Sequence, residues 1–225
     1  MARASRHYIP GQIWHITHRC HKRDFLLNLV KDQRRYIQWL FEAKRRYGLT
    51  ILNYTVTSNH IHLLVLDKKG RDVIPQSIKL VAGRIGQEYN LRKKRKGAFW
   101  EDRYHATAVE TGQHLLSCLG YIDLNMVRAG VVSYPSEWAF GGYNEIQKPR
   151  KKSVLIDHHK LSELSGFDRY DEFRMAHQEL ANDSLVNGNN IREAQWTESI
   201  AVGSKSFLEE IKGQIGNPRE RAKNS

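Results

Sequence analysis

Residues 50–66 read TILNYTVTSNHIHLLVL, and this stretch contains two runs of residues that favour β-structure. Residues 50–57 and 61–66 are rich in β-branched, aromatic and other apolar side chains. Ser58 and Asn59 separate the two runs, and both residue types are common in turns. The stretch therefore predicts two adjacent strands that run antiparallel to each other.

The flanking sequence adds further strands and helices. Residues 12–18 alternate with a period of two, which predicts a strand. Helical periodicity begins at Asp32, an N-cap candidate, and ends at Gly48; a second helix is predicted from Pro75 into the basic segment 92–96. Residues 103–110 predict a strand, and residues 113–129 predict a third helix closed by Gly130.

The resulting order is β-α-β-β-α-β followed by α, which is typical of a ferredoxin-like split β-α-β fold of the α+β class. We expect a four-stranded antiparallel sheet with helices on one face, and we expect the other face to be free for a ligand. Apolar periodicity weakens beyond residue 142. Residues 1–147 are therefore assigned to one domain and residues 148–225 to a helical C-terminal extension, with KPRKK (148–152) as a linker and weak helical patterns at 168–180 and 204–214.

The charge of the 225-residue chain is strongly basic. Lys and Arg number 36 against 24 Asp and Glu, so the formal net charge is +12 and the sequence pI is about 9.7. Residues 1–150 carry +13 and residues 151–225 carry −1. Such an excess attracts polyanions, nucleic acid above all, and we expect the binding surface in the first two thirds of the chain.

Cysteine content and hydropathy indicate the compartment. Cys20 and Cys118 form no C-x-x-C pair, which argues against a disulfide framework and against a cysteine zinc site. The N-terminus lacks the apolar stretch of a signal peptide, and His62 interrupts the longest apolar run. We therefore expect a cytoplasmic protein without a membrane-spanning segment.

Four polar residues are candidates for chemistry. His60 and His62 alternate along a predicted strand, so both imidazoles point to one side and could share a metal ion. Tyr121 and Asn125 lie four residues apart on one face of the third helix. Each has a structural alternative: a histidine that caps the turn or fills the sheet surface, a boundary tyrosine and an exposed asparagine. Together they could hold a divalent cation on a phosphodiester beside a phenolate nucleophile.

Three stretches carry a family resemblance: TSNHIHLLV (57–65), FWEDRYHATAVE (99–110) and YIDLNMVRAGVV (121–132). With PGQIWHITHR (10–19), they resemble the REP-associated tyrosine transposases, relatives of the single-tyrosine HUH insertion-sequence transposases. The resemblance implies a ferredoxin-like fold and a Mg²⁺- or Mn²⁺-dependent endonuclease and strand transferase that acts on single-stranded DNA. Its substrates would be palindromes that fold into hairpins.

The resemblance also implies a role for each site residue. His60 and His62 match the pair that binds the metal, Asn125 completes the metal site, and Tyr121 matches the nucleophile that joins the 5′ phosphate and leaves a free 3′ hydroxyl. This chain has Asp123 where the family pattern has His, and Met126 where it has Pro. We expect Asp123 to place a carboxylate near the DNA path or the metal.

Other basic and aromatic residues are candidates for DNA contacts. Phosphates could be neutralised by Arg92, Lys93, Lys94, Arg95, Lys96, Arg103 and Arg128, and unpaired bases could stack on Trp14, Trp100 or Tyr104. The alternatives are a solvated helix end for the basic run and core positions for the tryptophans.

Two further hypotheses compete with the nicking enzyme. The first is a non-catalytic module of the RNA-recognition type, although its Gly/aromatic motif is absent from the sequence. The second is a domesticated relative that binds single-stranded hairpins with slow or no cleavage. A monomer is expected, a dimer is the alternative, and DNA binding would associate the protein with the nucleoid.

Overall fold

The computed structural model describes residues 9–68, 70, 72–152, 154–187 and 191–216. Its centre is a sheet of order β2-β3-β1-β4-β5. The first four strands pair antiparallel and β5 pairs parallel to β4. The strands are β1 (Ile13–Arg19), β2 (Thr50–Val56), β3 (His60–Leu66), β4 (His105–Val109) and β5 (Ala201–Val202). The predicted antiparallel order is confirmed, and a fifth strand from the C-terminal extension is added at the β4 edge.

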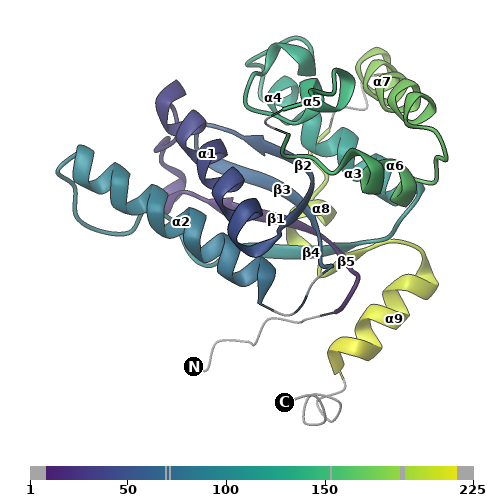
Figure 1. Ribbon diagram of the computed structural model, residues 1–225, viewed down its shortest axis with the longest axis horizontal. Coiled ribbons are helices and arrows are strands. Elements are labelled where there is room, and N and C mark those ends of the chain that lie inside the picture. The colour runs from purple at the N-terminus through teal and green to yellow at the C-terminus, as the bar shows by residue number, and fades with distance from the viewer. Residues whose placement is uncertain (1–8, 69, 71, 153, 188–190, 217–225) are drawn as a thin grey trace.

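One face of the sheet is covered by α1 (Val30–Tyr47) and α2 (Val73–Arg92), which lie side by side in Figure 1. Helix α1 ends where expected, because Gly48 adopts φ 71°, a left-handed conformation that suits glycine. The predicted N-cap was wrong: α1 begins at Val30, and the Asp32 carboxylate instead accepts two hydrogen bonds from Arg92 of α2, at 2.6 and 2.8 Å.

The other face of the sheet is also covered, so the expectation of a free face was wrong. It packs against α3 (Gln113–Asp123) and, from the extension, against α8 (Gln195–Glu198). The predicted single helix over residues 113–129 is interrupted at Leu124, whose φ −80° and ψ 3° end α3, and α4 (Asn125–Arg128) follows. The interruption places Tyr121 and Asn125 on two consecutive short helices.

The C-terminal extension is helical, as expected, and the basic segment 148–152 is irregular. The predicted helical patterns at 168–180 and 204–214 correspond to α7 and α9, which begin at Tyr170 and Lys205. The 3₁₀ segments are His21–Arg23 and Pro135–Glu137, and the remaining helices are α5 (Tyr143–Gln147), α6 (His158–Leu164), α7 (Tyr170–Val186) and α9 (Lys205–Gly216). None of the helices in the described ranges has the length and apolar character needed to cross a lipid bilayer.

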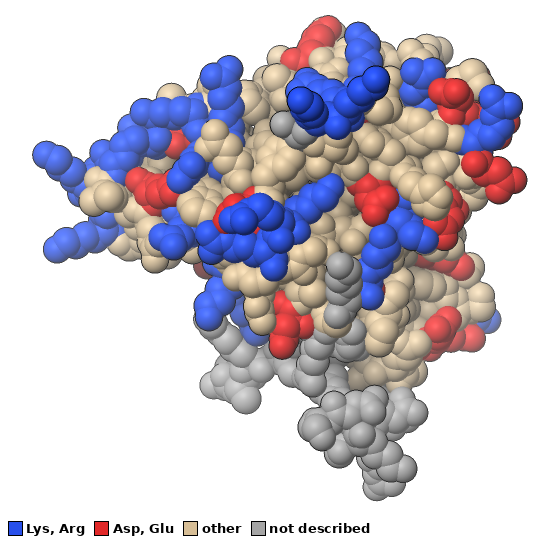
Figure 2. Space-filling view, viewed as in Figure 1, with Lys and Arg blue, Asp and Glu red and all other residues tan. Residues whose placement is uncertain are grey.

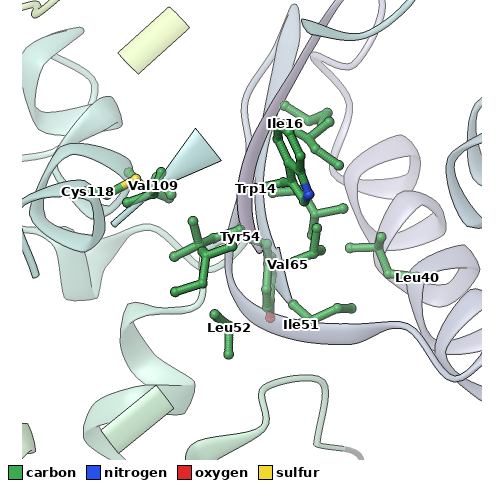
Figure 3. Close-up of a cluster of buried hydrophobic side chains, with 14 of the residues drawn as sticks. Trp14, Ile16, Leu40, Ile51, Leu52, Tyr54, Val65, Val109 and Cys118 are labelled. Atoms are coloured by element: carbon green, nitrogen blue, oxygen red, sulfur yellow. The ribbon is translucent and has the colours of Figure 1, made fainter. Parts of the chain in front are cut away.

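The hydrophobic core lies on both faces of the sheet. Figure 3 shows Trp14, Ile16 and Leu40 on the α1 side, with Val109 and Cys118 on the α3 side. Extension residues such as Phe173 and Trp196 belong to the same buried cluster and are almost fully excluded from solvent. The domain boundary at residue 147 stays a prediction.

Candidate active site

His60 and His62 lie on β3 and point to the sheet face that α3 covers. Strand alternation places both on this face, beside Thr17 of β1, which pairs with His62. Their ring centroids are 5.0 Å apart. The predicted clustering of the two imidazoles is therefore present in the structure.

Hydrogen bonds fix the orientation of both imidazoles. His60 Nδ1 lies 2.7 Å from Asn59 Oδ1, and because that oxygen can only accept, His60 carries its proton on Nδ1 and has a lone pair on Nε2. His62 Nδ1 lies 2.9 Å from His15 Nε2. The tautomer in which His62 donates this bond likewise gives Nε2 a lone pair. A hydrogen bond at the other ring nitrogen fixes the tautomer and orientation of a histidine that binds a metal.

The two histidines are neutral at physiological pH. Burial lowers the pKa of His60 to about 4, and Arg19, Arg128 and Arg192 lower it further. Burial also lowers the pKa of His62 well below its usual value, with His60 and His15 adding to the effect. Neutral imidazole is the form that binds a metal ion, so the protonation state suits a ligand role.

Tyr121 lies on α3 with its ring against His62, at a centroid distance of 5.7 Å. The side chain is buried, with 6% of the residue exposed, and its other ring neighbours include Trp196 at 6.0 Å. The Arg128 guanidinium carbon lies 4.2 Å from the ring centroid. Burial raises the pKa of Tyr121, while Arg128 and Arg192 act in the opposite direction.

Asn125 completes the group from the start of α4. Its Nδ2 lies 3.0 Å from His62 Nε2. The described residues contain no group of three or more His, Cys, Asp or Glu placed to hold a metal ion, so the candidate donor set is two imidazoles and one amide. Rotation of the Asn125 amide by 180° would place Oδ1 where Nδ2 now lies. Two neighbouring ligand atoms that are each about 2.1 Å from an octahedral ion lie about 3.0 Å apart, which matches the distance between the Asn125 amide and His62 Nε2. The residues therefore fit a divalent cation.

The four residues line one cavity of about 330 Å³. Four arginines also line it: Arg19, Arg23, Arg128 and Arg192. Within the described parts of the chain, no carboxylate lines this cavity. The excess of positive charge fits a phosphodiester, because guanidinium groups bind phosphate oxygens strongly.

Asp123 does not lie near this cavity, contrary to expectation. Its Oδ2 lies 2.7 Å from Nε2 of His177 on α7, and its Oδ1 accepts a hydrogen bond from Asn53 at 3.0 Å. Both side chains of the Asp123–His177 pair are 1% exposed. Asp123 therefore joins α3 to the extension and does not provide a carboxylate to the site.

The predicted DNA contacts are spread over several surfaces. Arg128 lines the active-site cavity, and Arg103, Trp100 and Tyr104 line neighbouring cavities. Trp14 is a core residue, 6% exposed, on the opposite sheet face. The basic run at residues 92–96 lies at the end of α2, where Figure 2 shows Lys and Arg gathered at the left of the view, and none of the five residues lines the cavity.

Sequence reasoning missed several residues of the site. The alternation of residues 12–18 shows which side of its strand His15 occupies. Its place beside His62 can be predicted only if the pairing of β1 with β3 is known. Arg192 and Thr197 line the cavity from the extension, and the Trp196 ring lies 6.0 Å from the Tyr121 ring; all three residues come at least 60 residues after the motif at 121–132. Neither the charge nor the periodicity of the extension indicates that these residues lie at or beside the cavity.

Comparison with known proteins places this site in a family. Residues 9–125 match the family model described as IS200-like transposase. Because the match spans more than half of the chain, the protein belongs to the IS200-like transposase family. The family resemblance predicted from the motifs is confirmed.

Two solved structures are similar to the chain. One is a REP-associated tyrosine transposase bound to a REP hairpin, with 20% identity and a TM-score of 0.54, covering 75% of this chain and 98% of that one. The other is described as a transposase from Deinococcus radiodurans, with 15% identity and a TM-score of 0.38, covering 58% and 98% of the two chains. No curated protein matches the chain. The first likeness confirms the α+β fold.

Proposed function

We propose that the protein is a metal-dependent transposase that nicks and rejoins single-stranded DNA beside a palindromic hairpin, with Tyr121 as the nucleophile. The observation that carries the proposal is the meeting of Tyr121, His60, His62 and Asn125 in one arginine-lined cavity. A hairpin partner is supported by the similar REP-associated transposase, which was solved with a REP hairpin. The protein would act as a monomer, in the cytoplasm, on nucleoid DNA.

In the proposed reaction, the phenol oxygen of Tyr121 attacks the phosphorus of the scissile phosphodiester. A bond from this oxygen to phosphorus forms, and the bond from phosphorus to the 3′ oxygen breaks. The phenol loses its proton, the 3′ oxygen gains one, and the products are a 5′-phosphotyrosine and a free 3′ hydroxyl. Attack of another 3′ hydroxyl on the phosphotyrosine reverses these steps and joins strands.

His60, His62 and Asn125 would hold Mg²⁺ or Mn²⁺, which would polarise the phosphate and stabilise its developing charge. Arg128 has two supporting contacts with the nucleophile. It lies over the Tyr121 ring and donates a hydrogen bond to the Tyr121 carbonyl oxygen. Its charge also favours the phenolate, which opposes the effect of burial on the Tyr121 pKa.

The proposal is tested by formation of a covalent adduct. End-labelled single-stranded hairpins with randomised flanks are incubated with Mn²⁺ or Mg²⁺ and separated on a denaturing gel. We expect an SDS-resistant protein–DNA band with the native chain, and none without metal or with Tyr121→Phe or His60→Ala. Tyr47→Phe, at the end of α1, is the matched control and should form the band. A band in Tyr121→Phe would exclude Tyr121 as the nucleophile.

A non-catalytic hairpin-binding protein is the second candidate. The observation in its favour is the burial of Tyr121, which raises the pKa of the phenol and opposes its ionisation. Hairpin binding without an adduct under either metal would support this candidate.

A further inference from the structure

Two further cavities adjoin the candidate active-site cavity near the end of β1. The active-site cavity shares Thr17, Arg19 and Thr197 with a middle cavity of about 270 Å³. The middle cavity in turn shares His18, Asp102 and Arg103 with an outer cavity of about 380 Å³. Because each pair of neighbours shares lining residues, the three cavities lie in a row from Tyr121 to α2, and we call this row the groove.

The outer cavity has the walls of a site for a flat aromatic group. Its α2 side is largely apolar, with Pro75, Ile78 and Ala82, and Trp100 and Tyr104 face it from the segment before β4. Stacking on an aromatic side chain is the usual way in which proteins bind unpaired bases without strict sequence preference.

The aromatic wall is held rigidly in place. Trp100 Nε1 donates a hydrogen bond to the Ala82 carbonyl oxygen at 3.0 Å. The Trp100 ring is stacked on His18, with centroids 4.1 Å apart and planes 15° from parallel. His18 Nε2 in turn lies 2.8 Å from the Asp102 carbonyl oxygen. A preorganised wall loses little conformational entropy when a base stacks on it.

The charges along the groove are mixed in a way that suits DNA. Arg19 and Arg103 line the middle cavity and can bind phosphates, while three carboxylates also line it: Glu101, Asp102 and Glu198. Carboxylates accept hydrogen bonds from the amino groups of bases. Lys79 stands exposed at the outer cavity. A strand could therefore turn its phosphates to the arginines and its bases to the remaining walls.

We propose that the unpaired flank of the hairpin substrate follows this groove, and that one flanking nucleobase seats in the outer cavity against Trp100 and Tyr104. This proposal rests on the proposed function. It adds a base-binding subsite that is separate from the metal and the nucleophile, so it makes DNA affinity depend on a nucleotide away from the scissile phosphate.

The test combines a substitution that fills the outer cavity with DNA substrates that lack one base at a time. Hairpins with randomised unpaired flanks are selected on the immobilised native chain, and the enriched DNA is resynthesised with a single abasic nucleotide at each flank position. Affinity is measured for the native chain, for Ala82→Leu, which fills the cavity, and for Gln87→Leu, which adds the same side chain on an exposed position of α2.

For the native chain and Gln87→Leu, we expect one abasic position to weaken binding roughly 5- to 150-fold, the range for loss of one stacked base. Ala82→Leu should bind the intact DNA more weakly by a similar factor and lose its sensitivity at that position. A fluorescent 2-aminopurine at the same position should be quenched on binding to the native chain, which tests the subsite without any substitution.

The outcomes separate this proposal from the proposed function. If hairpins bind but no abasic position weakens binding and no 2-aminopurine is quenched, the base subsite is wrong and the adduct assay is unaffected. Equal sensitivity of Ala82→Leu and the native chain would also overturn it. If no hairpin binds to the native chain, both proposals fail.

Discussion

His15 is fully buried and links the metal-binding candidates to the pH dependence of stability. Burial lowers its pKa to about 3, so the folded protein keeps it neutral while the unfolded chain takes up a proton near pH 6.5. Since the unfolded state then binds more protons, this residue lowers stability progressively as the pH falls from about 6.5 to about 3.

We predict that His15→Phe removes part of this pH dependence. Each pH unit below about 6.5 should cost the native chain about 1.4 kcal/mol through His15, and the variant should lack this contribution. Urea unfolding at several pH values between 4 and 7 measures the free energy of unfolding of both chains. His159→Phe, at an exposed site on α6, is the control and should follow the native curve. Parallel curves for His15→Phe and the native chain would contradict the assignment.

The same histidine should affect metal binding. Loss of a hydrogen-bond partner of a metal-binding histidine typically weakens metal affinity roughly 10- to 100-fold. His15→Phe keeps an aromatic ring beside His62 but removes the bond to His62 Nδ1. Titration calorimetry with Mn²⁺ should show this loss, and unchanged affinity would mean that His15 does not orient His62.

Local sequence patterns predicted that the four candidate site residues could lie together, but they did not predict which other residues surround them. His60 and His62 follow from strand alternation, and Tyr121 and Asn125 from helical spacing, because both patterns are local. Asp123 was misplaced because its direction depends on α7, which lies more than 40 residues further along the chain. A partner from a distant segment leaves no periodic signal near the residue.

At the scale of elements, the Asp123–His177 pair joins α3 to α7 and is almost fully buried. We predict that His177→Phe destabilises the fold by about 3 kcal/mol, because it removes the His177 partner of a buried carboxylate and leaves that carboxylate with the Asn53 hydrogen bond. The double variant with Asp123→Asn should recover part of this loss, since residue 123 then carries an uncharged amide in place of the carboxylate. Urea unfolding of the native chain, His177→Phe, Asp123→Asn and the double variant measures the coupling.

An exposed ion pair provides the comparison for this prediction. Lys160 and Glu163 lie three residues apart on the surface of α6, and removing Lys160 should leave the unfolding midpoint almost unchanged. If His177→Phe also left the unfolding midpoint unchanged, the buried pair would not be the contact that holds α7 to α3.

The predicted elements were most accurate where a pattern extended over several turns or residues. Helix α1 ends at Tyr47 as expected because Gly48 marks its end, whereas the interruption at Leu124 is invisible since apolar periodicity continues through Met126. Strand β5 has two residues and is too short to give an alternation signal. Local patterns thus locate long helices and strands, but they do not locate interruptions within helices or strands of two residues.

At the scale of the whole molecule, the extension contributes to both the core and the site. Phe173, Trp196 and Val202 are buried in the same cluster as the sheet residues, and Arg192 lines the active-site cavity. The sequence suggested an appendage because the extension is nearly neutral and weakly periodic. Its packing depends on complementary surfaces formed only after the sheet and α3 have assembled.

We therefore predict that the chain unfolds as one cooperative unit. Far-ultraviolet circular dichroism and tryptophan fluorescence should give coincident urea transitions, because a shared core couples the two segments. A chain cut after residue 147 loses Phe173 and Trp196 and should show no cooperative transition. A chain cut before α9 loses chiefly Ile211 from the core and should keep a transition at lower urea concentration. If residues 1–147 unfolded cooperatively at the native midpoint, the extension would be an independent appendage, and the contact of Trp196 with Tyr121 would contribute nothing to the stability of residues 1–147.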